Sequence, residues 1–103
     1  MVSVEVKCET ASIAAYLMRE FGKHPNDVRV KVSPADDLFT FQPLRSGFLK
    51  VLRSPLLNFG SDVKLRLVNS ETWLTVRKFV KLDDSEFAKA SGRPNDDADE
   101  TQS

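Results

Sequence analysis

The 103 residues include 15 Lys and Arg and 15 Asp and Glu, so the formal net charge is zero. This length supports one domain with a modest core. A composition with 41% hydrophobic and 29% charged residues excludes collagen-like, mucin-like and fully disordered chains.

The first third of the chain predicts a strand, a helix and a second strand. Residues 2–8 alternate apolar with polar side chains, which is typical of a half-buried strand. Residues 13–21 carry apolar side chains at helical spacing, and Thr10 or Ser12 is the expected N-cap. Residues 28–32 alternate again, so we expect a second strand parallel to the first, because a helix connects the two.

The middle of the chain leaves one alternative open. Residues 38–41 predict a short third strand. Residues 44–60 fit either a short helix, capped by Ser46 and limited to about two turns by Pro55, or a strand over residues 48–52. Periodicity does not distinguish helix from strand in so short an apolar run.

Two further alternating runs, residues 63–67 and residues 74–82, predict an antiparallel hairpin. The sequence between them, residues 69–71, has the composition of a turn. Lys78 interrupts the apolar face of the second run, so we expect a bulge or a sheet edge there.

The C-terminal part differs in composition from the rest. Residues 83–103 hold seven acidic and two basic side chains, with a cluster of helix and strand breakers at residues 91–95. We therefore predict a single α+β domain over residues 1–88, followed by a disordered acidic tail over residues 89–103.

The predicted order of elements is β-α-β-(β)-(α)-β-β. Because the strong strands all alternate, we expect a sheet with helices on one face and solvent on the other. The sequence therefore predicts a two-layer α+β sandwich in a ferredoxin-like order, with an additional strand at the C-terminal end of the domain.

Cysteine usage and hydropathy predict a cytoplasmic protein. Cys8 is the only cysteine, so a disulfide framework cannot form within the chain, which suits a reducing compartment. The apolar runs are too short to span a membrane. Residues 1–9 alternate where a signal peptide has an apolar run, so we expect neither a signal peptide nor a membrane partner.

The zero net charge conceals three unequal segments. Residues 1–40 hold five basic and six acidic side chains, whereas residues 41–82 hold eight basic side chains against only Asp62 and Glu71. Residues 83–103 are strongly acidic. A basic segment followed by an acidic one is the most informative feature of the composition.

A strand over residues 74–82 would place basic and aromatic side chains together on the face opposite the core. This combination is typical of a surface for single-stranded nucleic acid, because cations follow the phosphates and aromatic rings stack on the bases. We expect Lys7, Arg29 and Lys31 to join it from the first two strands. The predicted nucleic-acid-binding residues are Lys64, Arg66, Trp73, Arg77, Phe79 and Lys81, helped by Arg45, Lys50 and Arg53.

The competing hypothesis is a protein-interaction module, either an accessory or an inhibitor subunit, that docks a protein partner through the same face. Trp73, Phe79 and Phe87 are its candidate anchors, and the edge near Lys78 is its candidate docking edge. A homodimer formed through the sheet is one version of this hypothesis. Packing of the aromatic rings under a loop would explain the same residues without any ligand.

No pattern predicts catalysis, a metal centre or a cofactor. Cys8 ends an alternating strand on its apolar face, which indicates a buried small hydrophobe. His24 is the only histidine, and its place after the first predicted helix suits the negative end of that helix. We therefore expect a non-enzymatic protein with no metal and no cofactor.

The acidic tail has three interpretations. It imitates nucleic acid and competes for the basic face, it recruits a basic partner, or it is a solvated segment that aids solubility.

Overall fold

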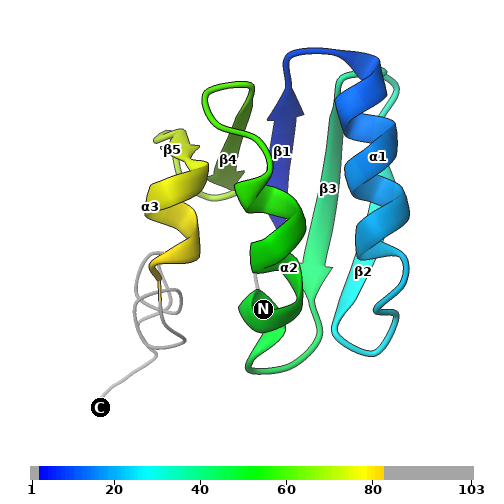
Figure 1. Ribbon diagram of the computed structural model, residues 1–103, viewed down its shortest axis with the longest axis vertical. Helices are drawn as coiled ribbons and strands as arrows, with labels where there is room; N and C mark the ends of the chain where they lie inside the picture. Colours follow the sequence, from blue (N-terminus) through cyan, green and yellow to red (C-terminus); the bar gives the residue numbers. More distant parts are fainter. Residues whose placement is uncertain (1–2, 83–103) are drawn as a thin grey trace.

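The computed structural model describes residues 3–82 as one antiparallel five-stranded sheet with three helices (Figure 1). In chain order the elements are β1 (Val4–Cys8), α1 (Ala11–Phe21), β2 (Val28–Val32), β3 (Leu38–Pro43), α2 (Phe48–Leu57), β4 (Val63–Leu67), β5 (Leu74–Thr75) and α3 (Val76–Val80). The strand order is β2-β3-β1-β4-β5. The α+β class predicted from the sequence is confirmed.

All three helices lie on one face of the sheet (Figure 1). β1 and β2 each pair antiparallel with β3, which lies between them. They therefore run in the same direction, as the sequence predicts for strands joined by a helix, although they do not pair with each other. The opposite face of the sheet carries no helix within the described part of the chain.

Alternation in the strands sorts the side chains between the two faces. In β1, Val4, Val6 and Cys8 are buried toward the helices, whereas Glu5 and Lys7 project from the open face. β4 repeats the pattern, with its apolar side chains buried and its two cations half-buried on the open face. One-sided burial of this kind fixes the register, because a shift by one residue would exchange the two faces.

The stretch of residues 44–60 contains a helix, α2, and no strand. α2 begins after Gly47, whose φ of 85° favours glycine, and not after Ser46 as the sequence suggested. Pro55 lies within the last turn, and the helix continues to Leu57. The fully buried Leu56 explains this continuation, since ending the helix at Pro55 would remove that side chain from the core.

The predicted hairpin is wrong in its second half. β5 spans only two residues, and the chain then turns into α3. Thr75 caps this helix, since its hydroxyl accepts a hydrogen bond from the Lys78 backbone N–H at 3.2 Å. Val76, Phe79 and Val80 have helical spacing and are all buried, whereas an alternating strand would have directed Phe79 away from the other two.

The core centres on a cluster of phenylalanine rings between the sheet and the helices. Phe41 of β3 lies with its ring centroid 5.3 Å from Phe21, 6.2 Å from Phe48 and 6.3 Å from Phe79. These four rings come from β3 and from each of the three helices, and all are fully buried. The cluster therefore ties every helix to the same point of the sheet.

None of the helices within residues 3–82 is long and apolar enough to cross a membrane. The predicted boundary between domain and tail, and the candidate anchor Phe87, lie outside the described residues.

Replacing Phe79 tests the helical placement of residues 76–80. We expect Phe79→Ala to lower the free energy of unfolding by about 3–5 kcal/mol, because it leaves a cavity beside Phe41. Urea denaturation measures this loss. The neighbouring Lys78→Ala is the control, and its effect should stay within about 0.5 kcal/mol. A small effect of Phe79→Ala would contradict the burial described above.

Candidate nucleic-acid interface

The open face of the sheet carries a cross-strand array of polar side chains. The registers align Lys31, Thr40, Glu5 and Arg66 in one row, and Lys7 and Lys64 in the next. Arg29 lies beside Gln42 at the β2 end. Five cations and one carboxylate, that of Glu5, therefore share this face of β1, β2 and β4.

Arg66 organises the centre of this face. Its Nε donates to Glu5 Oε1 at 3.1 Å, and its Nη2 donates to the same carboxylate oxygen. Its Nη1 donates to the backbone carbonyl of Ser70 at 3.3 Å. These contacts fix the guanidinium against β1 and against the chain that follows β4, so Arg66 is a structural cation rather than a free one.

The same guanidinium supports the indole of Trp73. The Arg66 Cζ lies 5.0 Å from the centroid of the Trp73 ring, which is a cation–π contact. Trp73 remains 39% exposed. One polar side chain thus holds a large aromatic ring in place next to the open face.

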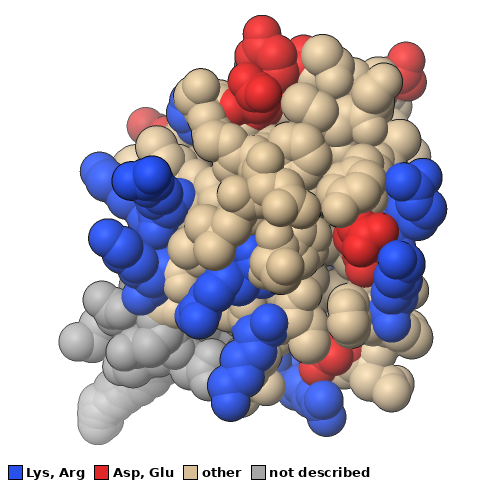
Figure 2. Space-filling view, viewed as in Figure 1, with Lys and Arg blue, Asp and Glu red and all other residues tan. Residues whose placement is uncertain are grey.

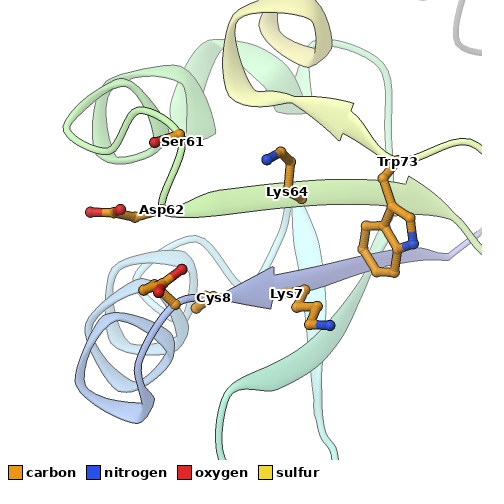
Figure 3. A pocket seen from close by; sticks show the side chains of 7 residues that line it. Lys7, Cys8, Ser61, Asp62, Lys64 and Trp73 are labelled. Carbon is orange, nitrogen blue, oxygen red and sulfur yellow. The ribbon is translucent and has the colours of Figure 1, made fainter.

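Trp73 also lines a cavity of about 350 Å³ beside the two lysines of the second row. Figure 3 shows Lys7, Lys64 and Trp73 toward one end, and Ser61 and Asp62 at the other. Glu9 also lines this cavity. The site therefore combines an aromatic surface, two ammonium groups and carboxylates that accept hydrogen bonds.

Lys7 and Lys64 are direct cross-strand partners. Like charges directly opposite each other destabilise a sheet. Neither lysine makes an ion pair among those found in the described residues. In Figure 3 the two side chains extend in opposite directions from β4 and β1, so a phosphate bound by either ammonium group would lower the repulsion, and each lysine is a separate candidate phosphate contact.

The structure divides the nine residues predicted for nucleic-acid binding into separate groups. Lys64, Arg66 and Trp73 are brought together on or beside the open face. Phe79 is fully buried in the core, so its assignment to that face is wrong. The physical reason is the helix over residues 76–80, which turns Phe79 inward.

Four of the predicted cations lie on the helices instead. Lys50 and Arg53 are exposed on α2, and Arg77 and Lys81 are exposed on or just after α3. Arg53 also donates to the Val80 carbonyl at 3.4 Å, which links α2 to α3. Figure 2, which views the helix-bearing side, shows basic side chains over the α3 flank and the lower end.

Arg45 occupies a third position, in the loop after β3. Its Nε donates to Asp27 Oδ1 at 2.6 Å, so this cation joins the end of β3 to the start of β2. Because its carboxylate partner is nearly buried, Arg45 acts mainly as a local structural contact.

Sequence reasoning missed the contacts that shape the site. The ion pair between Arg66 and Glu5 joins residues 61 positions apart, and alternation alone does not show which strands are neighbours. The carboxylates of Glu9 and Asp62 were also not recognised as site residues. They share a cavity because β1 ends where β4 begins, and the Glu9 N–H donates to the Asp62 carbonyl at 2.8 Å.

No group of three or more His, Cys, Asp or Glu side chains that could hold a metal ion occurs within residues 3–82. Cys8 is buried, as the sequence predicted. Burial, with a smaller contribution from the charge of Asp37, raises the pKa of its thiol to about 11. A thiol in this environment is a poor nucleophile at neutral pH.

Comparison with known proteins assigns no relatives. No protein-family model matches the chain, and no curated protein or solved structure matches it at a significant level.

The raised pKa of Cys8 predicts a pH dependence of stability. The folded protein holds the thiol proton up to about pH 11, whereas an unfolded chain releases it near the ordinary pKa of 9.0. Stability should therefore fall as the pH rises between these values, by up to about 1.4 kcal/mol per pH unit. Urea denaturation at pH 7.5 and pH 10.5 measures the slope.

Cys8→Ala provides the comparison for this slope. The variant loses stability at every pH, but the part of the slope that belongs to the thiol should disappear. Equal slopes for the two proteins would contradict a raised thiol pKa.

Proposed function

We propose that the protein is a non-enzymatic module that binds single-stranded nucleic acid on the open face of its sheet. The observation that carries this proposal is the position of Trp73, which Arg66 supports beside the like-charged pair of Lys7 and Lys64. An exposed ring next to cations that form no ion pair within residues 3–82 is the combination that stacks a base and neutralises its phosphates.

The proposal favours single strands over duplexes because Trp73 needs a base whose face is free. In a duplex the bases are already stacked on one another, and removing one costs a few kcal/mol. The ring has one of its faces toward Arg66, and it borders the cavity that Lys7 and Lys64 also line. An unstacked base at the Trp73 end would have its own phosphate within reach of the lysines.

The remaining cations of the open face extend the surface toward β2. From β4 to β2 the face crosses three strand spacings, which is roughly 14 Å. At the 3.4 Å rise of a stacked strand this width corresponds to about four nucleotides. In this proposal Arg29 and Lys31 contact phosphates at the far end, and Glu5 is neutralised by Arg66.

The strand order supports a finer description of the architecture. We infer a ferredoxin-like arrangement, in which β4, β1, β3 and β2 form the basic sheet with α1 and α2 as its connecting helices. β5 and α3 are then additions after the fourth strand. A cytoplasmic location and a regulatory role of the acidic segment remain predictions from the sequence.

The second candidate function is docking of a protein partner, or of a second copy, through the same face. It shares the exposed ring of Trp73 as an anchor. The two candidates differ in salt dependence, because contacts to phosphates release counterions and make the affinity fall steeply with added salt.

Titration of labelled single-stranded DNA and RNA tests the proposal directly. Trp73→Ala should weaken binding by about 1–3 kcal/mol, which is about 5- to 150-fold, because one stacked base is lost. Fluorescence anisotropy across a salt series gives the affinity. Quenching of Trp73, the only tryptophan, reports stacking in the wild-type protein.

Charge reversal separates the two groups of cations. K7E/K64E should abolish measurable binding, because it replaces two phosphate contacts by charge repulsion. The matched control is K78E/K81E, which makes the same charge change on the helix-bearing side. Equal losses in both variants would contradict a site on the open face, and the absence of binding even at low salt would overturn the proposal.

A further inference from the structure

The second feature of the molecule that points to a partner is the outer edge of β2. β2 is the last strand of the sheet order and pairs with β3 alone within residues 3–82. An edge strand directs the N–H and C=O groups of alternate residues away from its neighbour, where another strand can pair with them. β2 contains no proline, and Val32 at its end is 80% exposed.

Two cavities lie where this edge meets α1. One of about 280 Å³ is lined by Gly22 after the helix and by Val28 and Val30 of the strand. The other, of about 230 Å³, is lined by Met18 of α1 and by Val32, together with residues of the loop that follows β2. Both are lined by β2 together with α1 or the residue that follows it, and Arg29 also lines the first.

The residues that line these cavities follow the face of β2 that an added strand would extend. Side chains on one face of a strand recur about every 7 Å, and Val28, Val30 and Val32 set the same spacing along β2. When a peptide is added to a sheet edge, main-chain hydrogen bonds give affinity, and pockets for alternate side chains give specificity. The edge of β2 provides main-chain groups for such hydrogen bonds and, beside α1, cavities for the side chains.

Charge decides what kind of strand fits. Arg29 and Lys31 are exposed and project from the opposite side of β2. Antiparallel pairing with a second copy, centred on Val30, would place Arg29 of one copy opposite Lys31 of the other. Like charges in that position are destabilising, so the edge resists self-pairing and favours carboxylates opposite the two cations.

We propose that the β2 edge is a strand-addition site for an extended segment of a partner protein in which apolar residues alternate with Asp or Glu. The segment runs antiparallel to β2. Its apolar side chains enter the cavities beside α1, and its two carboxylates pair across the edge with Lys31 and Arg29. Asp36 at the rim of the second cavity disfavours a carboxylate beyond that end.

The test uses the full-length protein and a fluorescently labelled peptide, Ser-Val-Glu-Val-Glu-Val-Ser. We expect binding by anisotropy, and about tenfold weaker binding of the peptide in which Lys replaces both Glu residues, because two favourable cross-strand pairs become repulsive. R29E/K31E should reverse this preference. Both positions are exposed, so the variant should fold like the wild-type protein.

The matched control reverses two cations of the same face away from the edge. K7E/K64E should change the affinity for the acidic peptide by less than about threefold, because those residues lie on β1 and β4. The same variant is expected to lose single-stranded nucleic acid, so failure of one proposal is distinguishable from failure of the other. An equal loss of peptide binding in K7E/K64E would overturn the edge site.

Backbone methylation of the peptide tests strand addition itself. In an added strand, every second amide donates to β2 and the others point to solvent. We therefore expect the peptide methylated on the amides of one frame to lose binding at least about tenfold, and the peptide methylated in the other frame to retain it. Tolerance of both methylated peptides, or no binding of the unmodified peptide, would overturn the proposal.

Discussion

The aromatic contact between Phe41 and the helices is the constraint on which the rest of the structure depends. Phe41 lies in β3, and its ring contacts rings from all three helices. A single buried centre of this kind gathers the helices on one side of the sheet, because each must reach the same ring to bury its own phenylalanine. The open face is the consequence of this one-sided core.

Because the open face is not covered by a helix, it can carry charged side chains. These side chains differ in how much they contribute to the fold. Arg66 is the cation that the fold itself needs, since it joins β1, the chain after β4 and the indole ring. Lys7 and Lys64 make no comparable contacts among the described residues. They lie directly opposite each other on β1 and β4, and the repulsion between their charges lowers stability. A residue that lowers stability and makes no compensating contact in the fold is a good candidate for a role in binding.

The sequence was informative where one periodicity extended over a whole element. The alternation in residues 2–8 and 63–67 correctly predicts β1 and β4, and the helical stripe correctly predicts α1. Strand order was less accessible, since the neighbours of β1 are separated from it by more than 20 residues along the chain. Local patterns contain no direct information on such distant pairing.

The error over residues 76–80 has a specific physical cause. Val76 and Val80 fit both a period of two and a helical spacing, so the run is ambiguous until Phe79 is assigned to a face. Two signals favoured the helix: Thr75 precedes the run as a potential cap, and Lys78 breaks the alternation. That single reassignment moves Phe79 into the core and Arg77 and Lys81 to the other side of the molecule.

The division of cations between the two sides affects how any polyanion would bind. The helix-side residues Lys50, Arg53, Arg77, Lys78 and Lys81 are exposed, and neither α2 nor α3 contains an acidic side chain. They attract anions by long-range electrostatics, but α2 and α3 themselves offer no exposed aromatic ring, since Phe48 and Phe79 are both buried. The open face adds Trp73 and the repelling pair of Lys7 and Lys64, so a nucleic-acid strand bound there would gain both base stacking and relief of repulsion. A ligand that relieves repulsion between two lysines of the folded state also stabilises that state by mass action. A ligand bound on the helix side would not gain this contribution, because the cations there do not lie directly opposite each other on neighbouring strands.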